Sequence, residues 1–343
     1  MKKSHVQYRQ VKESVSLDHL PTIKGYDYER NEREGFDLNE FVSAMATTGF
    51  QAANLAAAVR TVEIMKRERA VIFLASTSNM VSSGCREAIT YLVKKRAVHC
   101  VIITAGGVEE DVIKLLKPFV TGSFEASGEH LFRNGINRTG NIFVPNDRYA
   151  LFDKFMQGFL KGLYERERVV ASHAFTRELG LAVAKLERKG ESFLYWAARN
   201  KIPVICPALM DGAIGDLVHF FRQQHPAFRI DASEDLDVIL KLVLNAEKAG
   251  GIILGGGVAK HYVLNANIFR EGLDYTVYIN TGEEFDGSDS GARLDEAISW
   301  GKVKPRSPAV KVHCDATIAF PLLVAATFAR RDSGSEEEKK EGK

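Results

Sequence analysis

The sequence has few cysteines and no closely spaced pair of them. Its four cysteines, Cys85, Cys100, Cys206 and Cys314, lie far apart along the chain and form no CxxC motif. This spacing argues against a disulfide framework and against a zinc framework, and no cluster of His, Cys or Asp has the spacing of metal ligands. We therefore expect free, mostly buried thiols in a reducing compartment, and no metal site.

An excess of charge of one sign is also lacking. The 343 residues include 46 Lys and Arg against 44 Asp and Glu, which gives a formal net charge of +2. A chain so near neutrality offers no electrostatic reason to expect binding to nucleic acid or to a membrane surface. The N-terminal MKKSHVQYRQVKES has no apolar core of a secretory signal, and the longest apolar run, residues 316–329, is too short to span a bilayer. A soluble cytoplasmic protein is the expectation.

Short apolar runs alternate with helical patterns along most of the chain. Six runs rich in Val and Ile predict strands, and most of them precede an amphipathic helix. They are residues 70–76, 98–104, 202–209, 250–254, 275–280 and 309–314. This order predicts an α/β fold with a Rossmann-like parallel β-sheet and helices on both faces. One or two further helices are expected between residues 38 and 67.

No linker divides the chain, so we expect a single large domain with an N-terminal extension. Residues 1–35 are polar, lack periodicity and form the extension, which is expected to be partly flexible. The domain itself occupies residues 36–330. Residues 331–343 are rich in charged and small residues and are expected to be a disordered tail. Residues 118–201 are less regular and form either an insertion or a layer of helices.

Three turns that follow predicted strands are rich in small residues. They are STSNMVSSG at 76–84, TAGGVEED at 104–111 and GGGVAKH at 255–261. Ligands of an open parallel sheet bind where strands end, and small residues let backbone amides of a helix N-terminus approach a phosphate. No turn is a GxGxxG or a P-loop, and no GxSxG nucleophile elbow is present. A dinucleotide site and plain tight turns both remain open.

The stretch GEEFDGSDSGARLDEAISWGK, residues 282–302, places six carboxylates ahead of one lysine. The ordinary explanation is a solvated acidic loop, with Asp289 or Ser290 as the cap of a helix that starts near Ala292.

The end of this stretch favours a pocket instead. Glu296 and Trp300 are four residues apart and share a helix face, and Gly301 is well placed to end the helix. Lys302 then lies beside the indole. A carboxylate with an aromatic face grips an alkylammonium group through charge and cation–π attraction.

Two other pairs of polar residues follow predicted strands. His261 and Asn265 are four apart on the helix after the glycine turn, so both face one way. Asp211 and Asp216 flank the turn in MDGAIGD. The alternatives are a purely structural histidine at 261 and a helix N-cap at Asp211.

Together these motifs resemble one family. GGGVAKHYVLNAN followed by INTGEEFDGSDSGARLDEAISWGK closely resembles the C-terminal half of deoxyhypusine synthases. STSNMVSSG, TAGGVEEDVIK, KGYDY and TTGFQAANL resemble the same family in the same order, and the resemblance runs from about residue 21 to residue 329.

The resemblance implies an NAD-dependent enzyme and a homotetramer with sites shared between subunits. Such enzymes transfer the aminobutyl group of spermidine to one lysine of the precursor of eukaryotic translation initiation factor 5A, forming deoxyhypusine. The group passes through an imine on an enzyme lysine, 1,3-diaminopropane leaves, and NAD is regenerated.

The resemblance also implies roles for residues at matching positions. Lys302 would be the nucleophile and His261 the general base or proton relay. The polyamine would be held by Asp216, Asn265, Asp289, Glu296 and Trp300. NAD would be surrounded by Ser78, Asn79, Thr104, Ala105, Gly106, Glu110, Asp211, Gly256, Gly257, Thr281, Asp286, Ser290 and Asp315, with Glu110 also near the polyamine.

Other functions remain open at this stage. A homospermidine synthase-like enzyme would share these sites but donate the group to putrescine. A non-catalytic partner subunit of a paralogue is a second alternative, against which the intact Lys302 argues. An ordinary NAD dehydrogenase is a third, and it would accumulate NADH.

Overall fold

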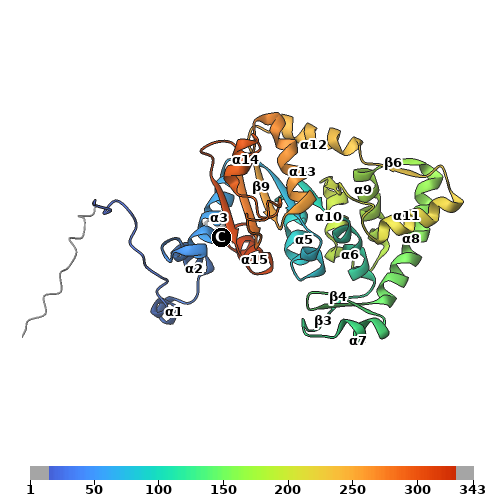
Figure 1. Ribbon diagram of the computed structural model, residues 1–343, viewed down its shortest axis with the longest axis horizontal. Helices are drawn as coiled ribbons and strands as arrows, with labels where there is room; N and C mark the ends of the chain where they lie inside the picture. The colour runs from blue at the N-terminus through green and yellow to red at the C-terminus, as the bar shows by residue number, and fades with distance from the viewer. Residues whose placement is uncertain (1–14, 330–343) are drawn as a thin grey trace, which may run out of the picture.

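The computed structural model describes residues 15–329 and is built around a six-stranded sheet (Figure 1). Neighbouring strands are parallel throughout, in the order β11-β10-β9-β1-β2-β7. The strands are β1 (Val71–Ser76), β2 (Cys100–Ile103), β7 (Val204–Ile205), β9 (Ala249–Leu254), β10 (Tyr275–Asn280) and β11 (Ala309–His313). All six predicted strands are therefore confirmed, as is the Rossmann-like fold class. The predicted tail and the first 14 residues of the extension lie outside the described residues.

The strand order contains one reversal. From β1 the chain steps through β2 to β7 at one edge, restarts at β9 on the other side of β1, and steps through β10 to β11. This is the doubly wound order of dinucleotide-binding folds, in which ligands bind where the order reverses. The reversal lies between β1 and β9, so the turns after Ser76 and Leu254 stand side by side.

Helices cover both faces of the sheet, as β1 illustrates. Ile72 and Leu74 belong to the core beneath α3 (Phe50–Arg67), α5 (Arg86–Lys94) and α15 (Ala316–Thr327). Phe73 and Ala75 point the other way, toward α12 (Glu234–Asn245) and α13 (Gly257–Asn267). Burial on both faces explains why the strands are continuous apolar runs rather than alternating ones.

Residues 118–201 contain both a small sheet and a set of helices. The antiparallel sheet has the order β3 (Val120–Thr121), β5 (Ile142–Pro145), β4 (Ile136–Thr139), and β6 (Val169–Ala171) pairs separately with β8 (Arg229–Asp231). The helices here are α7 (Gly128–Arg133), α8 (Asn146–Arg166), α9 (Ser172–Ala182) and α10 (Phe193–Asn200). These five strands were not predicted, because they are short and β3 and most of β4 are exposed.

The remaining helices include α2 and η1, which begin the helical segment predicted between residues 38 and 67, and α14, the predicted helix before Gly301. They are α1 (Glu29–Glu34), α2 (Leu38–Ala44), η1 (Met45–Thr47), α4 (Asn79–Ser82), α6 (Ala105–Leu116), η2 (Val183–Lys185), η3 (Lys189–Glu191), α11 (Ala213–Gln224), η4 (Ile268–Arg270) and α14 (Leu294–Ser299). Within the extension, α1 was not predicted; it buries no residue and stands away from the sheet (Figure 1). Among residues 15–329, no helix has the length and apolar character needed to cross a membrane.

Helices α9 and α10 approach closely at one glycine. A Cβ at Gly180 of α9 would collide with the backbone of Leu194 in α10, lying 2.8 Å from its carbonyl carbon. Backbone cannot yield as a flexible side chain can, so this contact requires glycine.

Gly180→Ala is expected to lower the free energy of unfolding by about 1–3 kcal/mol, because the added methyl group forces the two helices apart. Gly158→Ala in α8 is the matched control, since a Cβ there meets nothing within 4 Å. The control should gain about 0.5–1 kcal/mol from its higher helix propensity. Chemical denaturation of both variants measures the difference, and equal shifts of the same sign would contradict the close approach.

Candidate active site

The turns at the strand-order reversal pack against one another. The backbone N–H of Ser78 donates to Thr104 Oγ1 at 2.9 Å, which ties the turn after β1 to the turn after β2. A Cβ at Gly106 would lie 2.9 Å from Ser78 Cβ, so the start of α6 touches the same turn. Asn79 and Ala105 are the first residues of α4 and α6. The structure thus brings these five predicted cofactor residues together.

The glycine turn after β9 lies between this group and the acidic stretch. Gly255 and Gly257 have φ of 80° and 62°, values that favour glycine. A Cβ at Gly255 would lie 2.8 Å from Thr77 Oγ1, and one at Gly256 would collide with Ser290. Gly255 and Gly256 therefore allow the turn after β1 and the acidic loop to approach from either side, and Ser290 is brought to the same group of turns.

The other predicted cofactor residues follow the strands on both sides. Asp315 caps α15, and its carboxylate accepts the Thr317 N–H at 2.8 Å. Asp286 lies in the exposed acidic loop and accepts the Ser288 N–H at 2.7 Å. Thr281 directly follows β10.

Two adjacent carboxylates of α6 are held in a poorly solvated place. Ser82 donates its hydroxyl to Glu110, and burial raises the pKa of Glu110 to about 7. Burial also raises the pKa of Glu109, whose Oε2 accepts the N–H of Ile214 at 3.0 Å. Glu109 thus caps α11, and the alternative of Asp211 as that cap is wrong. No sequence motif pointed to Glu109, because its partner is about a hundred residues away.

The structure places Lys302 through the end of α14. Gly301 has φ of 69°, and its N–H donates to the Ile298 carbonyl at 2.9 Å. The Lys302 N–H donates to the Ala297 carbonyl at 2.9 Å, which completes a Schellman motif. Lys302 Nζ lies 5.5 Å from the centroid of the Trp300 ring, as the spacing predicted.

The predicted cap of this helix is wrong. Helix α14 starts at Leu294, and its N-cap is Arg293, which makes no capping hydrogen bond. Asp289 and Ser290 lie earlier in the loop, turned toward α13 and the glycine turn. Both are held there by contacts with other segments, which local spacing does not reveal.

Lys302 is 9% exposed and lines a narrow pocket of about 20 Å³ with Asp289, Glu296 and Trp300. A second lysine, Lys260, lines it as well. Lys260 is 2% exposed, donates to the carbonyl oxygen of Asp289 and lies 4.7 Å from the centroid of the Tyr278 ring. Burial lowers the pKa of Lys260. Sequence reasoning missed this residue, since a lysine beside His261 on an otherwise mixed helix gave no signal.

A short polar chain continues from this pocket along α13. His261 Nδ1 lies 3.4 Å from Asp289 Oδ1, and Asn265 Nδ2 lies 2.8 Å from His261 Nε2. The His261 ring therefore has the Asp289 carboxylate beside one nitrogen and the Asn265 side-chain amide beside the other. The histidine is held by both neighbours and keeps half of its side chain exposed.

Asp216 does not join the Lys302 pocket within one chain. It lies in the first turn of α11, which follows edge strand β7, whereas α14 follows β10. Three strands, β9, β1 and β2, separate β10 from β7, and Figure 1 shows the two helices at opposite sides of the sheet. Asp211 and Asp216 instead lie near Glu109, whose pKa their charges raise. Among residues 15–329, no three His, Cys, Asp or Glu side chains are grouped to hold a metal ion.

Comparison with known proteins gives one consistent result. The model of the deoxyhypusine synthase family matches residues 40–327. The chain is 44% identical to deoxyhypusine synthase of Caenorhabditis elegans over 342 residues, 90% of each protein, and 44% identical to that of Musa acuminata, covering 93% of this chain and 92% of the relative. A solved protein from Entamoeba histolytica, described as a deoxyhypusine synthase, superposes with a TM-score of 0.64 at 27% identity, covering 91% of this chain and 99% of that one.

The pKa of Glu110 leads to a prediction on stability. In the unfolded chain this carboxyl ionises near pH 4.5, but in the fold only near pH 7. Ionisation therefore favours the unfolded state between these values, and stability falls as pH rises through that window. Glu110→Gln removes this titration, so its melting temperature should fall less than that of the wild type from pH 4.5 to 7.

Asp111 titrates in an overlapping range, since burial raises its pKa to about 6, so part of the slope should persist in Glu110→Gln. Glu187→Gln, at an exposed glutamate, is the matched control and should follow the wild type. Differential scanning fluorimetry at several pH values makes the measurement. A Glu110→Gln curve parallel to that of the wild type would show that Glu110 is already ionised in the fold.

Proposed function

The chain belongs to the deoxyhypusine synthase family, and from this and the site geometry we propose that it transfers the aminobutyl group of spermidine to a lysine of the translation initiation factor 5A precursor. The observation that carries the proposal is Lys302, a buried amine beside the Trp300 ring in a pocket that also contains Asp289 and Glu296. Carboxylates beside an indole face attract an alkylammonium chain, and the Lys302 amine offers a nucleophile to it.

The group of turns at the strand-order reversal fits an NAD cofactor. Its strand order, the positive φ of Gly255 and Gly257, and the start of α6 at Ala105 are features that accept a dinucleotide. Ser78, Thr104, Gly106 and Ser290 meet there and would hold it, together with the nine other residues predicted above to surround NAD. When bound, NAD supplies the acceptor and later the donor of a hydride.

Lys302 performs the covalent step in this proposal. Oxidation of spermidine at its secondary amine yields an imine, and the neutral amine of Lys302 attacks the imine carbon. The new bond to Nζ replaces the bond to 1,3-diaminopropane, which leaves with the proton that Lys302 gives up. The acceptor lysine then displaces Lys302 in the same way, and reduction of the new imine gives deoxyhypusine.

The surrounding side chains position the substrate. The carboxylates of Asp289 and Glu296 attract the ammonium groups, and the Trp300 face packs against the alkyl chain. His261, held between Asp289 and Asn265, would act as the general base or proton relay for the secondary amine.

A second copy of the chain is proposed to complete the site. Asp216 and Glu110 lie beside β7 and β2, away from Lys302 in the same chain. Trp300 and Phe285 are 65% and 87% exposed, large apolar surfaces that a partner would cover. A homotetramer in which one copy supplies Lys302 and another Asp216 accounts for both facts.

Lys302→Arg is expected to lower transfer by about a thousand-fold or more, because the guanidinium keeps the charge but is not a nucleophile. Borohydride trapping of the enzyme with labelled spermidine measures the covalent intermediate. Transfer of the label to the acceptor protein measures the product. NAD binding should persist, and Lys154→Ala, at an exposed lysine of α8, should retain activity. Full transfer by Lys302→Arg would refute its role, and transfer to putrescine alone would refute the proposed acceptor.

Mixing two inactive variants tests the shared site. Lys302→Ala and Asp216→Ala, refolded or co-expressed together, should recover about a quarter of wild-type activity, because half of the pairs are mixed and each mixed pair has one intact site of two. Mixing Lys302→Ala with Glu296→Ala is the control and should recover nothing, since both residues come from one chain. Equal recovery in the two mixtures would contradict the division of the site.

A further inference from the structure

A cavity of about 720 Å³ lies away from the candidate active site, between α9, the end of α10 and α12. Val71 and Ile202 line it, so it opens near the amino ends of β1 and β7, whereas the glycine turn lies at the carboxyl end of β9. The floor is apolar, formed with Pro203, Val238 and Leu242. A cavity of this size accepts a small organic molecule.

The ionisable residues that line this cavity are all basic. They are His173, Arg177, Lys201 and Lys241, and no acidic residue joins them. Arg177 is partly neutralised, since it lies 3.2 Å from Glu178. Within the described part of the chain, neither Lys201 nor Lys241 has a carboxylate within 4.0 Å. The two ammonium groups are therefore available to an anion.

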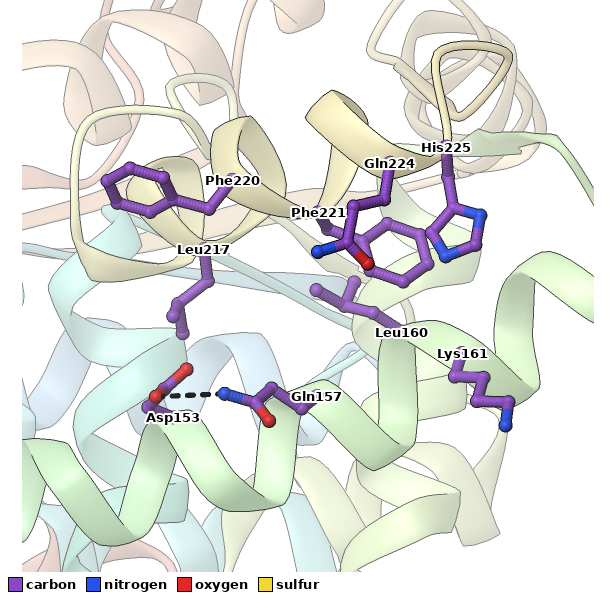
Figure 2. Close-up of a pocket in the computed structure, with 9 residues that line it drawn as sticks. All are labelled: Asp153, Gln157, Leu160, Lys161, Leu217, Phe220, Phe221, Gln224 and His225. Atoms are coloured by element: carbon purple, nitrogen blue, oxygen red, sulfur yellow. Dashed lines mark hydrogen bonds between the residues drawn. The ribbon is translucent and has the colours of Figure 1, made fainter.

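A second cavity shows that such a bias is not general in this fold. It measures about 490 Å³ and lies between α8 and α11. Figure 2 shows its acidic residue, Asp153, hydrogen-bonded to Gln157 on the same helix as the basic Lys161, with His225 across from them. Mixed charges there favour no particular ligand, in contrast to the wholly basic lining of the first cavity.

The histidine of the basic cavity is fixed from behind by a buried acid. Asp235 is 1% exposed, and its Oδ1 accepts the His173 backbone N–H at 2.7 Å and lies 2.9 Å from Nδ1 of the ring. Burial of a carboxylate costs free energy unless it is hydrogen-bonded, and the hydrogen bonds of Asp235 with His173 offset that cost and fix the position of the ring. With Nδ1 engaged, Nε2 is the nitrogen left for a ligand.

We propose that this cavity binds a small anion with an apolar body, such as a carboxylate or sulfonate on a hydrocarbon or aromatic group. The apolar floor takes the body. Lys201 and Lys241 take the anionic end through charge-assisted hydrogen bonds, in the cavity that His173 also lines. The site is separate from the one proposed for spermidine and NAD, and it does not depend on that assignment.

The test uses the fluorescent probe 1-anilinonaphthalene-8-sulfonate with the full-length protein. Saturating NAD is present, so that the proposed cofactor site is filled and the probe does not bind there. Lys201→Asn combined with Lys241→Gln should raise the probe's Kd at least five-fold. Lys201 has φ of 59°, a conformation that asparagine tolerates, so the fold should persist and the melting temperature verifies this. Decanoate should displace the probe, and its uncharged methyl ester should not.

Lys161→Gln is the matched control, because it removes one charge from the cavity of Figure 2 instead. It should leave the Kd within two-fold of the wild-type value. The proposal is overturned if the double variant binds the probe as the wild type does, if Lys161→Gln weakens binding more, or if ester and acid displace the probe equally.

Discussion

The close approach of three chain segments at Gly255 and Gly256 is the constraint on which the site depends. The turn after β1 touches this glycine turn on one side and Ser290 of the acidic loop touches it on the other. A methyl group at either contact would force the segments apart. The turns at the strand-order reversal and the loop that leads to Lys302 are joined through this turn, so the residues predicted to surround NAD and the Lys302 pocket become neighbours within one domain.

Much of the fold could be predicted because its central strands are buried on both faces. A strand such as β9 is an unbroken apolar run of strand length that ends at a glycine turn, and these local features identify it. The strands outside the main sheet gave no such signal, since β4 has exposed Asn137, Arg138 and Thr139 and is held by pairing with β5. Local composition does not predict the pairing between one segment of the chain and another.

In the candidate site, too, the features that depend on nearby residues were predicted and those that depend on distant contacts were not. The placement of Lys302 beside Trp300 was predictable, because a helix face and a glycine end depend only on nearby residues. Glu109 and Lys260 were missed, since each serves a partner far along the chain, Ile214 and Asp289 respectively. Asp216 was expected beside Lys302, but one chain keeps them on different strands. If a second copy supplies Asp216, as proposed, only the assembly brings the two residues together, and local spacing carries no information on assembly.

The backbone at Lys302 is held from two directions. Its N–H is bound to the end of α14, and its carbonyl accepts the Leu273 N–H at 3.0 Å. Only the four methylenes of the side chain remain free to move, inside a pocket of about 20 Å³. In the proposed mechanism the one Nζ atom of Lys302 must carry the aminobutyl group between the departure of one amine and the attack of the next. If Lys302 acts as proposed, the donor must leave before the acceptor enters, so the kinetics should follow a double-displacement order.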